Sequence, residues 1–343
     1  MQQKTGVVKP KKTFSQWLKS RKGQQAVIII LFTIIPLLLL FTFTYLPFAE
    51  MVKFSFYKMK YVGKREYVGL DNYAALFRRK DIVKSMVLCL YYMVGAVFQI
   101  ALALYLATVL SMKVKGGNLF KGIIFFPYLI NGIAIGFIFR FFYARGYVLD
   151  TVLQALGFEL EQLPKWLQNQ KINNWSLVVS SVWRYCGQQM VLFIGAIMSV
   201  DDTLYEAAKI DGANRFQQFK YIILPSIKTI VTLNIILSIS GSLSAFEAPY
   251  VITDGANGTG TFFIIMNTIA HVDQKVGLAS AMAVFLLIII IICTLLQKLL
   301  FKYLFRNMES DDESFTAKKA RKKAAKAEKK AAKVQTGALK GGM

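Results

Sequence analysis

The sequence has little of the chemistry on which most catalytic and metal sites depend. It contains one histidine, His271, and three cysteines, Cys89, Cys186 and Cys293. One histidine leaves almost no material for histidine-based triads or metal clusters, and each cysteine lies in a different apolar run without metal-type spacing. We therefore expect no disulfide, no metal site, no cofactor and no catalytic residue, with the cysteines serving as small buried apolar side chains.

Acidic residues are scarce as well. Asp and Glu number 19 against 42 Lys and Arg, which gives a formal net charge of +23. Charged residues make up only 18% of the chain, whereas a soluble domain carries about a quarter. The two facts agree only if charge is segregated along the chain, and basic residues do gather in residues 1–25 and 318–340. We therefore set aside a soluble globular fold.

What the chain has instead is long apolar runs. A helix needs about 20 apolar residues to cross the roughly 30 Å hydrocarbon core of a bilayer. Six runs reach this length, at 26–48, 84–110, 119–142, 176–200, 226–249 and 277–301. The first is too long for the core of a secretory signal and no A-x-A-like site follows it, so we expect it to be retained. The sequence thus predicts an all-α integral membrane protein with six transmembrane helices within residues 26–305.

The distribution of Lys and Arg predicts the orientation, because these residues concentrate in short cytoplasmic loops. Both termini are expected in the cytoplasm, as a basic N-terminal segment (1–25) and a Lys/Ala-rich tail (306–343). The composition of the tail cannot bury a core, so we expect it to be disordered, attracted to anionic membrane lipid, and not to bind nucleic acid. The basic, aromatic loop 49–84 then lies outside, either as a folded cap or as an amphipathic element on the membrane surface.

The segment 201–225, between the fourth and fifth runs, reads DDTLYEAAKIDGANRFQQFKYIILP. It is amphipathic and too polar to span a membrane. Glu206, Ala207 and Ala208 favour helix, and Gly212 follows Asp211 where a helix can end and turn. The segment therefore predicts two short helices with a glycine bend, which present a compact face to a cytosolic partner. The alternative is an ordinary connecting loop.

This segment resembles the cytoplasmic loop of ABC import permeases, in which Glu-Ala-Ala, three residues, Gly, nine residues, Ile, one residue and Leu-Pro follow in order. The matching residues are Glu206, Ala207, Ala208, Gly212, Ile222, Leu224 and Pro225. Residues 69–77 and 251–283 also resemble loops of sugar permeases of the maltose and glycerol-phosphate "first permease" type. The resemblance covers roughly residues 26–305.

The resemblance implies a type I ABC importer fold and a permease subunit in the bacterial cell membrane that carries a sugar or oligosaccharide. The implied partners are a second permease, two cytosolic ATPase subunits and an extracellular substrate-binding protein. Residues 201–225, including Asp211, would dock on an ATPase subunit; we call them the coupling loop. The chain has no G-x-x-x-x-G-K-[ST] phosphate loop, so ATP would be bound by the partners and this subunit would not be an enzyme.

Polar side chains within two apolar runs form the second group of candidate residues. Ser181, Arg184, Tyr185 and Gln188 are spaced i, i+3, i+4 and i+7, and Asn234, Ser238, Gly241 and Ser242 are spaced i, i+4, i+7 and i+8. Either spacing places a set on one helical face. Polar groups in a membrane usually face protein or a water-filled cavity. We predict that they line the substrate path, with Tyr185 as a surface for sugar stacking. The alternative is close packing between helices.

Arg184 lies too deep in its run to be interfacial. We expect it to pair with Glu247, although it could instead bind an acidic substrate. The loop Asp254–Thr261 is rich in Gly, Asn and Thr and is expected to contain turns. The resemblance suggests that it contacts the binding protein or the cavity mouth, and the alternative is a solvated loop. Two other classes of protein remain as alternatives, a membrane-embedded enzyme and a secondary transporter. A membrane-embedded enzyme would need clustered acids or histidines at the membrane surface, and a secondary transporter commonly has an internal repeat. The sequence shows neither feature, so neither class is favoured.

Overall fold

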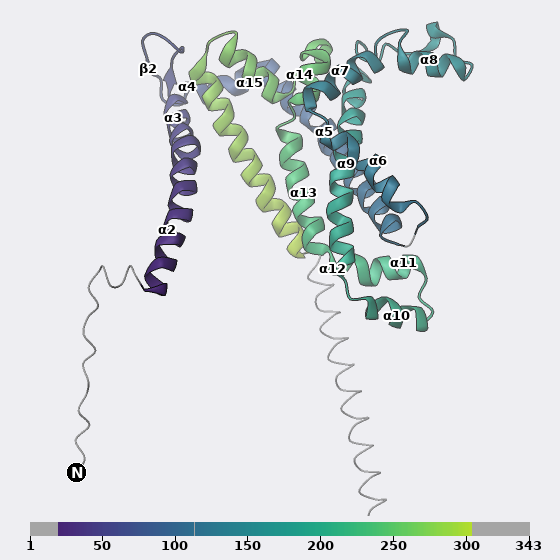
Figure 1. The fold of residues 1–343 in the computed structure, drawn as a ribbon. Helices are drawn as coiled ribbons and strands as arrows, with labels where there is room; N and C mark the ends of the chain where they lie inside the picture. The colour runs from purple at the N-terminus through teal and green to yellow at the C-terminus, as the bar shows by residue number, and fades with distance from the viewer. Residues whose placement is uncertain (1–19, 113, 304–343) are drawn as a thin grey trace, which may run out of the picture.

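The computed structural model describes residues 20–112 and 114–303. The predicted tail 306–343 and most of the predicted segment 1–25 lie outside these residues. The described chain is largely helical, with one small hairpin (Figure 1). In chain order its elements are α2 (Arg21–Leu40), η1 (Phe41–Tyr45), α3 (Leu46–Phe54), β1 (Tyr57–Lys58), β2 (Glu66–Tyr67), α4 (Asp71–Arg78), α5 (Lys80–Ser111), α6 (Gly117–Leu129), α7 (Gly132–Phe142), α8 (Val148–Ala155), η2 (Leu160–Gln162), α9 (Asn173–Met198), α10 (Asp202–Ile210), α11 (Arg215–Gln218), η3 (Phe219–Ile223), α12 (Leu224–Ser226), α13 (Lys228–Leu243), α14 (Glu247–Thr253), η4 (Ala256–Gly258), α15 (Phe262–His271) and a last helix, Val276–Tyr303.

Helices occupy all six predicted apolar runs. Within residues 20–112 and 114–303, four helices are long and apolar enough to cross a membrane, namely Gly23–Phe54, Lys80–Ser111, Lys228–Thr253 and Val276–Tyr303. The pair α6 and α7 adds a fifth if it is counted as one span. Helix α9 fills the run predicted at 176–200 without a break, but it is not among the helices that qualify by length and apolar composition. The protein is therefore a multi-helix membrane protein, and the count of six spans stays a prediction.

The run predicted at 119–142 is not one continuous helix, and this corrects the sequence-based expectation. Helices α6 and α7 meet at an angle of 98°. Ile130 is extended, and the Asn131 side chain accepts a hydrogen bond from the Ile133 amide at 2.8 Å. An asparagine in this position caps a new helix. Apolar composition alone does not reveal the break, because both halves are strongly apolar.

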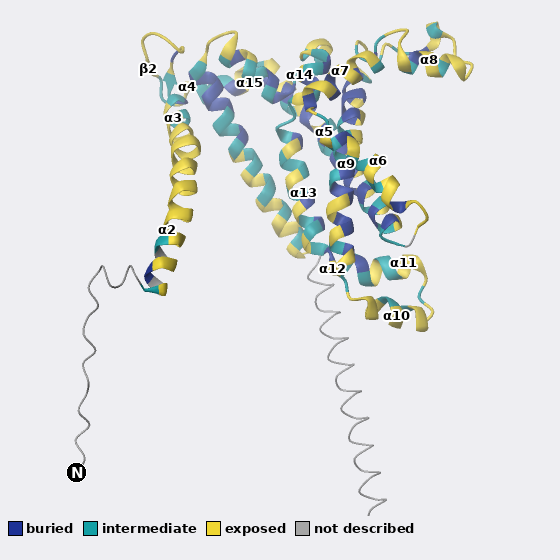
Figure 2. Cartoon of the chain, viewed as in Figure 1, coloured by how far each residue is buried: buried dark blue, intermediate teal, exposed yellow. Residues whose placement is uncertain are grey.

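Helix α9 is the centre of the packed body. It contacts α5, α6, α13 and α14, and more than half of its residues are buried (Figure 2). Met190 and Phe193 are completely buried among side chains of α5 and of the segment that leads into α13. Gly187 allows the closest approach, because a Cβ atom there would overlap the carbonyl oxygen of Ile124 in α6.

The loop 49–84, for which the sequence left two alternatives, is folded. Strands β1 and β2 pair antiparallel, with Tyr57 opposite Tyr67. The Asn72 side chain donates hydrogen bonds to the carbonyl oxygens of Ser55, at 2.8 Å, and Tyr57, at 3.0 Å. The Val276 amide donates to the Met59 carbonyl oxygen at 3.1 Å. These contacts fix the loop against the start of the last helix, as a folded cap requires.

Candidate functional site

A cavity of about 430 Å³ lies between α5, α7, α9, α13 and α14. This volume falls in the range of small-molecule sites, about 300–1,000 Å³. All eight residues that the sequence nominated for a substrate path line it: Ser181, Arg184, Tyr185, Gln188, Asn234, Ser238, Gly241 and Ser242. The two predicted helical faces therefore meet at one cavity. That a substrate passes through it stays a prediction.

The hydroxyl groups of these residues bond mainly to the backbone of their own helices. Ser181 donates to the Leu177 carbonyl oxygen at 3.1 Å, and Ser242 to that of Ser238 at 2.7 Å. The Asn234 side chain donates to the Ile230 carbonyl oxygen at 2.9 Å. Such back-bonding satisfies a polar group within a helix without a partner from another helix. These side chains therefore cost little to hold at an apolar depth and keep acceptor capacity.

Ser238 also fits the packing alternative. The Gln189 side chain donates to its hydroxyl oxygen at 2.7 Å, which ties α9 to α13 beside the cavity. The Oε1 atom of Gln189 and the hydroxyl of Tyr92 are buried and have no hydrogen-bond partner in the described part of the chain. Buried polar atoms are nearly always satisfied. These two atoms are therefore unsatisfied hydrogen-bonding groups beside the cavity.

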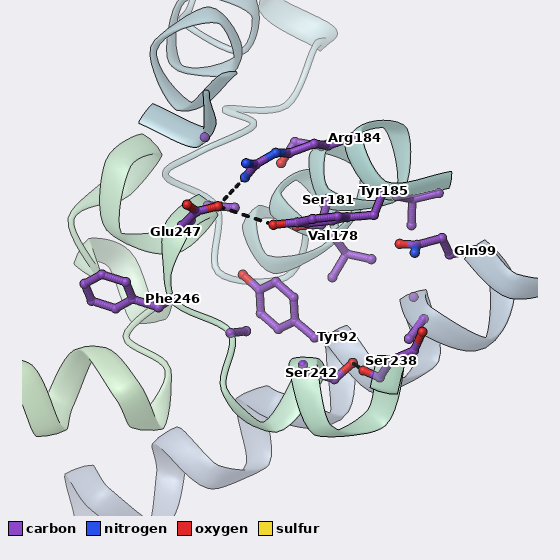
Figure 3. Close-up of a pocket in the computed structure, with 18 of the residues that line it drawn as sticks. Tyr92, Gln99, Val178, Ser181, Arg184, Tyr185, Ser238, Ser242, Phe246 and Glu247 are labelled. Atoms are coloured by element: carbon purple, nitrogen blue, oxygen red, sulfur yellow. Dashed lines mark hydrogen bonds and ion pairs between the residues drawn. The ribbon is translucent and has the colours of Figure 1, made fainter. Parts of the chain in front are cut away.

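The expected ion pair between Arg184 and Glu247 is present (Figure 3). The Tyr185 hydroxyl donates to the same Glu247 oxygen at 3.3 Å, and the Arg184 guanidinium lies over the Tyr185 ring at 4.9 Å from its centroid. Glu247 reaches this position because the helix breaks between Leu243 and Glu247, which begins α14. Arg184 therefore has an acidic partner within the chain.

Gly132, the first residue of α7, lies directly against the ion pair between Arg184 and Glu247. A Cβ atom there would come within 2.5 Å of Arg184 Nη1 and within 2.5 and 2.6 Å of the two Glu247 oxygens. The bend between α6 and α7 thus brings backbone directly against the ion pair. A side chain at this position would displace the ends of the Arg184 and Glu247 side chains, so glycine permits the close approach seen here.

Sequence reasoning missed several residues of the cavity. Gln99 of α5, Gln189 of α9 and Phe246 before α14 all line it, together with Tyr92. Gln99 and Gln189 are polar residues inside apolar runs, which was the signal used for the predicted set. They were missed because they do not extend a four-residue face. Phe246 and Tyr92 carry no such signal, since aromatic residues are common in apolar helices.

The coupling loop has the predicted form of two short helices and a glycine bend. The Asp201 side chain caps α10, and the hydrogen bond from the Thr203 amide, at 2.9 Å, holds the pKa of that carboxyl below its usual value. Gly212 has φ +75°. The Ala213 amide donates to the Ala208 carbonyl oxygen and the Gly212 amide to that of Lys209, which is the Schellman pattern that ends helices.

The predicted residues of the coupling loop separate into two groups by burial. Glu206, Ala207, Asp211 and Gly212 are exposed, whereas Ala208, Ile222, Leu224 and Pro225 are partly buried. Leu224 packs with buried Ile223 against the core around Phe193. The loop also exposes large apolar side chains, with Ile210 86% and Phe216 70% accessible. It is therefore anchored to the cavity-lining helices and leaves an apolar surface open.

Comparison with known proteins gives an independent result. Residues 99–306 match the family described as binding-protein-dependent transport system inner membrane component. The probable ABC transporter permease protein YurN of Bacillus subtilis (strain 168) is 32% identical over 78% of this chain and 93% of its own. The probable starch degradation products transport system permease protein AmyD of Thermoanaerobacterium thermosulfurigenes is 29% identical over 71% of this chain and 84% of its own.

The fold has a counterpart among solved structures. A chain of a bacterial ABC transporter involved in the import of the acidic polysaccharide alginate superposes with a TM-score of 0.72. The match covers 82% of this chain and 96% of that one, at 17% sequence identity, so the likeness is one of fold. Together with the matched residues 99–306, it places the cavity and the coupling loop within a known transport architecture. The chain belongs to the family of inner membrane components of binding-protein-dependent transport systems.

Proposed function

We propose that this chain is one of two permease subunits of an ATP-driven importer for a sugar or oligosaccharide. It forms half of the translocation pathway, and the second half is a different permease. Two cytosolic ATPase subunits bind and hydrolyse ATP, and an extracellular binding protein delivers the substrate. The chain itself binds no ATP or other cofactor. Both termini and the coupling loop face the cytoplasm, and six helices cross the membrane.

The continuity between cavity and coupling loop carries this proposal. Helix α9 lines the cavity with Arg184 and Tyr185 and ends at Met198, three residues before the coupling loop begins. Helix α13, which follows the loop, lines the cavity with Asn234 and Ser242. A displacement of the loop by a partner is thereby transmitted to both walls through packed side chains, as coupling between distant sites requires.

The assignment of a carbohydrate rests on the cavity wall and on a named relative. The wall combines hydroxyl and amide groups with the aromatic ring of Tyr185, which suits a ligand with many hydroxyl groups and an apolar ring face. AmyD is named for starch degradation products. Lining by side chains with hydrogen-bonding capacity also agrees with a path for a hydrated solute rather than with a lipid-binding surface.

A pull-down tests the coupling loop. The tagged chain is purified in mild detergent from its own cells, as wild type and as Ile210→Asp, and the ATPase activity of the co-purified material is measured. We expect wild type to bring down a second permease and an ATPase, and the variant to lose the ATPase, because a charge replaces an exposed apolar contact. Val62→Asp is the matched control, since Val62 is 88% exposed and lies in the hairpin at the other end of the molecule.

The transported compound is identified with the complete transporter in liposomes. Its binding protein and a mixture of neutral and uronic-acid oligosaccharides are added outside, ATP is enclosed, and the interior is analysed by mass spectrometry. ATP-dependent accumulation of an oligosaccharide is expected. If wild type purifies without any ATPase, and no sugar accumulates, the proposed function is wrong and a secondary transporter or a membrane enzyme must be considered again.

A further inference from the structure

Only two charged side chains line the cavity in the described part of the chain, Arg184 and Glu247. Their ion pair leaves this wall with a formal charge of zero. A path for an acidic oligosaccharide needs positive charge that is free to meet the carboxylates of the substrate. Arg184 is the only cation available on this wall, and Glu247 already occupies it.

The two partners of the ion pair differ in how far their side chains are exposed. The Arg184 side chain is 14% exposed, whereas the Glu247 side chain is 50% exposed. Figure 3 shows Arg184 and Tyr185 converging on Glu247 from α9. The carboxylate is therefore the more accessible partner of the pair, and the guanidinium is the more buried one.

We propose that Glu247 is a specificity-determining residue that makes this wall of the cavity accept neutral oligosaccharides and reject acidic ones. The proposal rests on the proposed function and names its class of substrate. Three groups hold the carboxylate in place: Arg184 and Tyr185 bind it, and Gly132 confines it from the start of α7. A fixed carboxylate accepts hydrogen bonds from sugar hydroxyl groups without a conformational cost at each transport cycle, and it repels uronate groups.

The proposal that Glu247 sets the electrostatic potential at this wall can be tested without knowing the substrate. Ser181, which lines the cavity one helical turn before Tyr185, is changed to Cys in a chain whose three native cysteines are replaced by Ala. The complete transporter in lipid nanodiscs then reacts with two methanethiosulfonate reagents, one carrying a sulfonate and one a trimethylammonium group. The ratio of the anionic to the cationic reaction rate reports the electrostatic potential at this wall.

The ratio of the anionic to the cationic reaction rate is expected to be lowest in the chain with both Arg184 and Glu247. It should be higher in the double variant Arg184→Gln/Glu247→Gln and highest in Glu247→Gln. The expected difference between the lowest and the highest ratio is about tenfold, which corresponds to about 1.4 kcal/mol. The double variant is decisive, because it removes both charges and leaves similar shapes. A ratio with Glu247 present that equals or exceeds that of the double variant would falsify the proposal. This comparison stands even if Glu247→Gln alone fails to fold. Glu66→Gln in the exposed hairpin is the matched control and should leave the ratio unchanged.

Uptake provides the second measurement. The wild-type transporter is expected to import neutral oligosaccharides from a mixture with galacturonate oligomers of equal length. Glu247→Gln should raise the galacturonate share about tenfold, and Glu247→Asp should not. If wild type imports a neutral sugar and Glu247→Gln leaves the share unchanged, this inference fails while the proposed function stands. If wild type imports nothing, the proposed function fails, and the reagent ratio still decides the charge assignment.

Discussion

Helices α2 and α9 reverse the relation between apolarity and burial that holds in soluble proteins. Within the span Gly23–Phe54, which includes all of α2 except its first two residues, none of the most apolar stretch is buried. Helix α9 carries Arg184 and two glutamines, yet most of its residues are buried or partly buried (Figure 2). In a bilayer the surrounding hydrocarbon is as apolar as leucine, so apolar side chains gain nothing by leaving it. Polar side chains must turn toward protein or a cavity.

The comparison separates two kinds of exposed apolar residue as well. In α2 they surround the helix on all sides and suit contact with lipid. In the coupling loop Ile210 and Phe216 stand out between exposed polar residues, which suits contact with a folded partner. Exposure alone therefore does not predict the effect of a substitution in this protein. The effect also depends on whether lipid or a folded partner surrounds the side chain.

The largest expected effect tests burial directly. Phe193→Ala should lower the free energy of unfolding by about 3–5 kcal/mol, because it empties a space in a completely buried cluster. Phe32→Ala, at a residue that is 78% exposed, should change it by about 0.5 kcal/mol or less. Thermal unfolding of the purified chain in detergent measures both. Equal losses would show that α2 is packed as tightly as α9, and the comparison would break.

A smaller effect is expected from two glycines of the same helix. Gly187→Ala should destabilise the protein by about 1–3 kcal/mol, because the new methyl group meets the backbone of α6. Gly195→Ala meets no atom and should be neutral or slightly stabilising, since alanine favours helix by about 1 kcal/mol. The same unfolding assay applies. A stable Gly187→Ala variant would mean that α6 and α9 are further apart than the structure has them.

The coupling loop offers a third test, in which backbone conformation replaces burial. Gly212 has φ +75° and open space around it, so Gly212→Ala should cost about 1–2 kcal/mol through strain alone. Gly212→Asn should recover part of this, because asparagine tolerates that conformation. The readout is substrate-stimulated ATPase activity of the complete transporter. Loss in the alanine variant without recovery in the asparagine variant would point to a contact at Gly212 instead of strain.

The smallest effect concerns acid and the start of α10. The pKa of the Asp201 carboxyl is lowered by its hydrogen bond from the Thr203 amide, so its contribution is present above the unfolded-state pKa and is lost as pH falls through the folded-state pKa. Fraying of α10 is therefore expected only below about pH 4. Hydrogen exchange at Thr203 would detect it. Asp201→Asn keeps an acceptor and should make the exchange independent of this titration.

Local features could be predicted from the sequence because they depend on neighbours in the chain. Helix in all six apolar runs, the bend at Gly212 and the two polar faces follow from composition and spacing within about one or two turns. The break between α6 and α7 could also have been suspected from Pro127 and Asn131, but proline is tolerated within membrane helices. Its presence alone therefore did not decide the matter.

By itself the sequence determined the largely helical membrane architecture, the family resemblance of the coupling loop and the eight residues that line the cavity. Only the tertiary structure decided that Glu247 is more exposed than Arg184, and that Gly132 lies against the pair. The reason is physical. Helical periodicity fixes which side chains share a face, whereas exposure within a cavity depends on helix breaks and on contacts between residues more than 50 positions apart, such as Arg184 and Glu247.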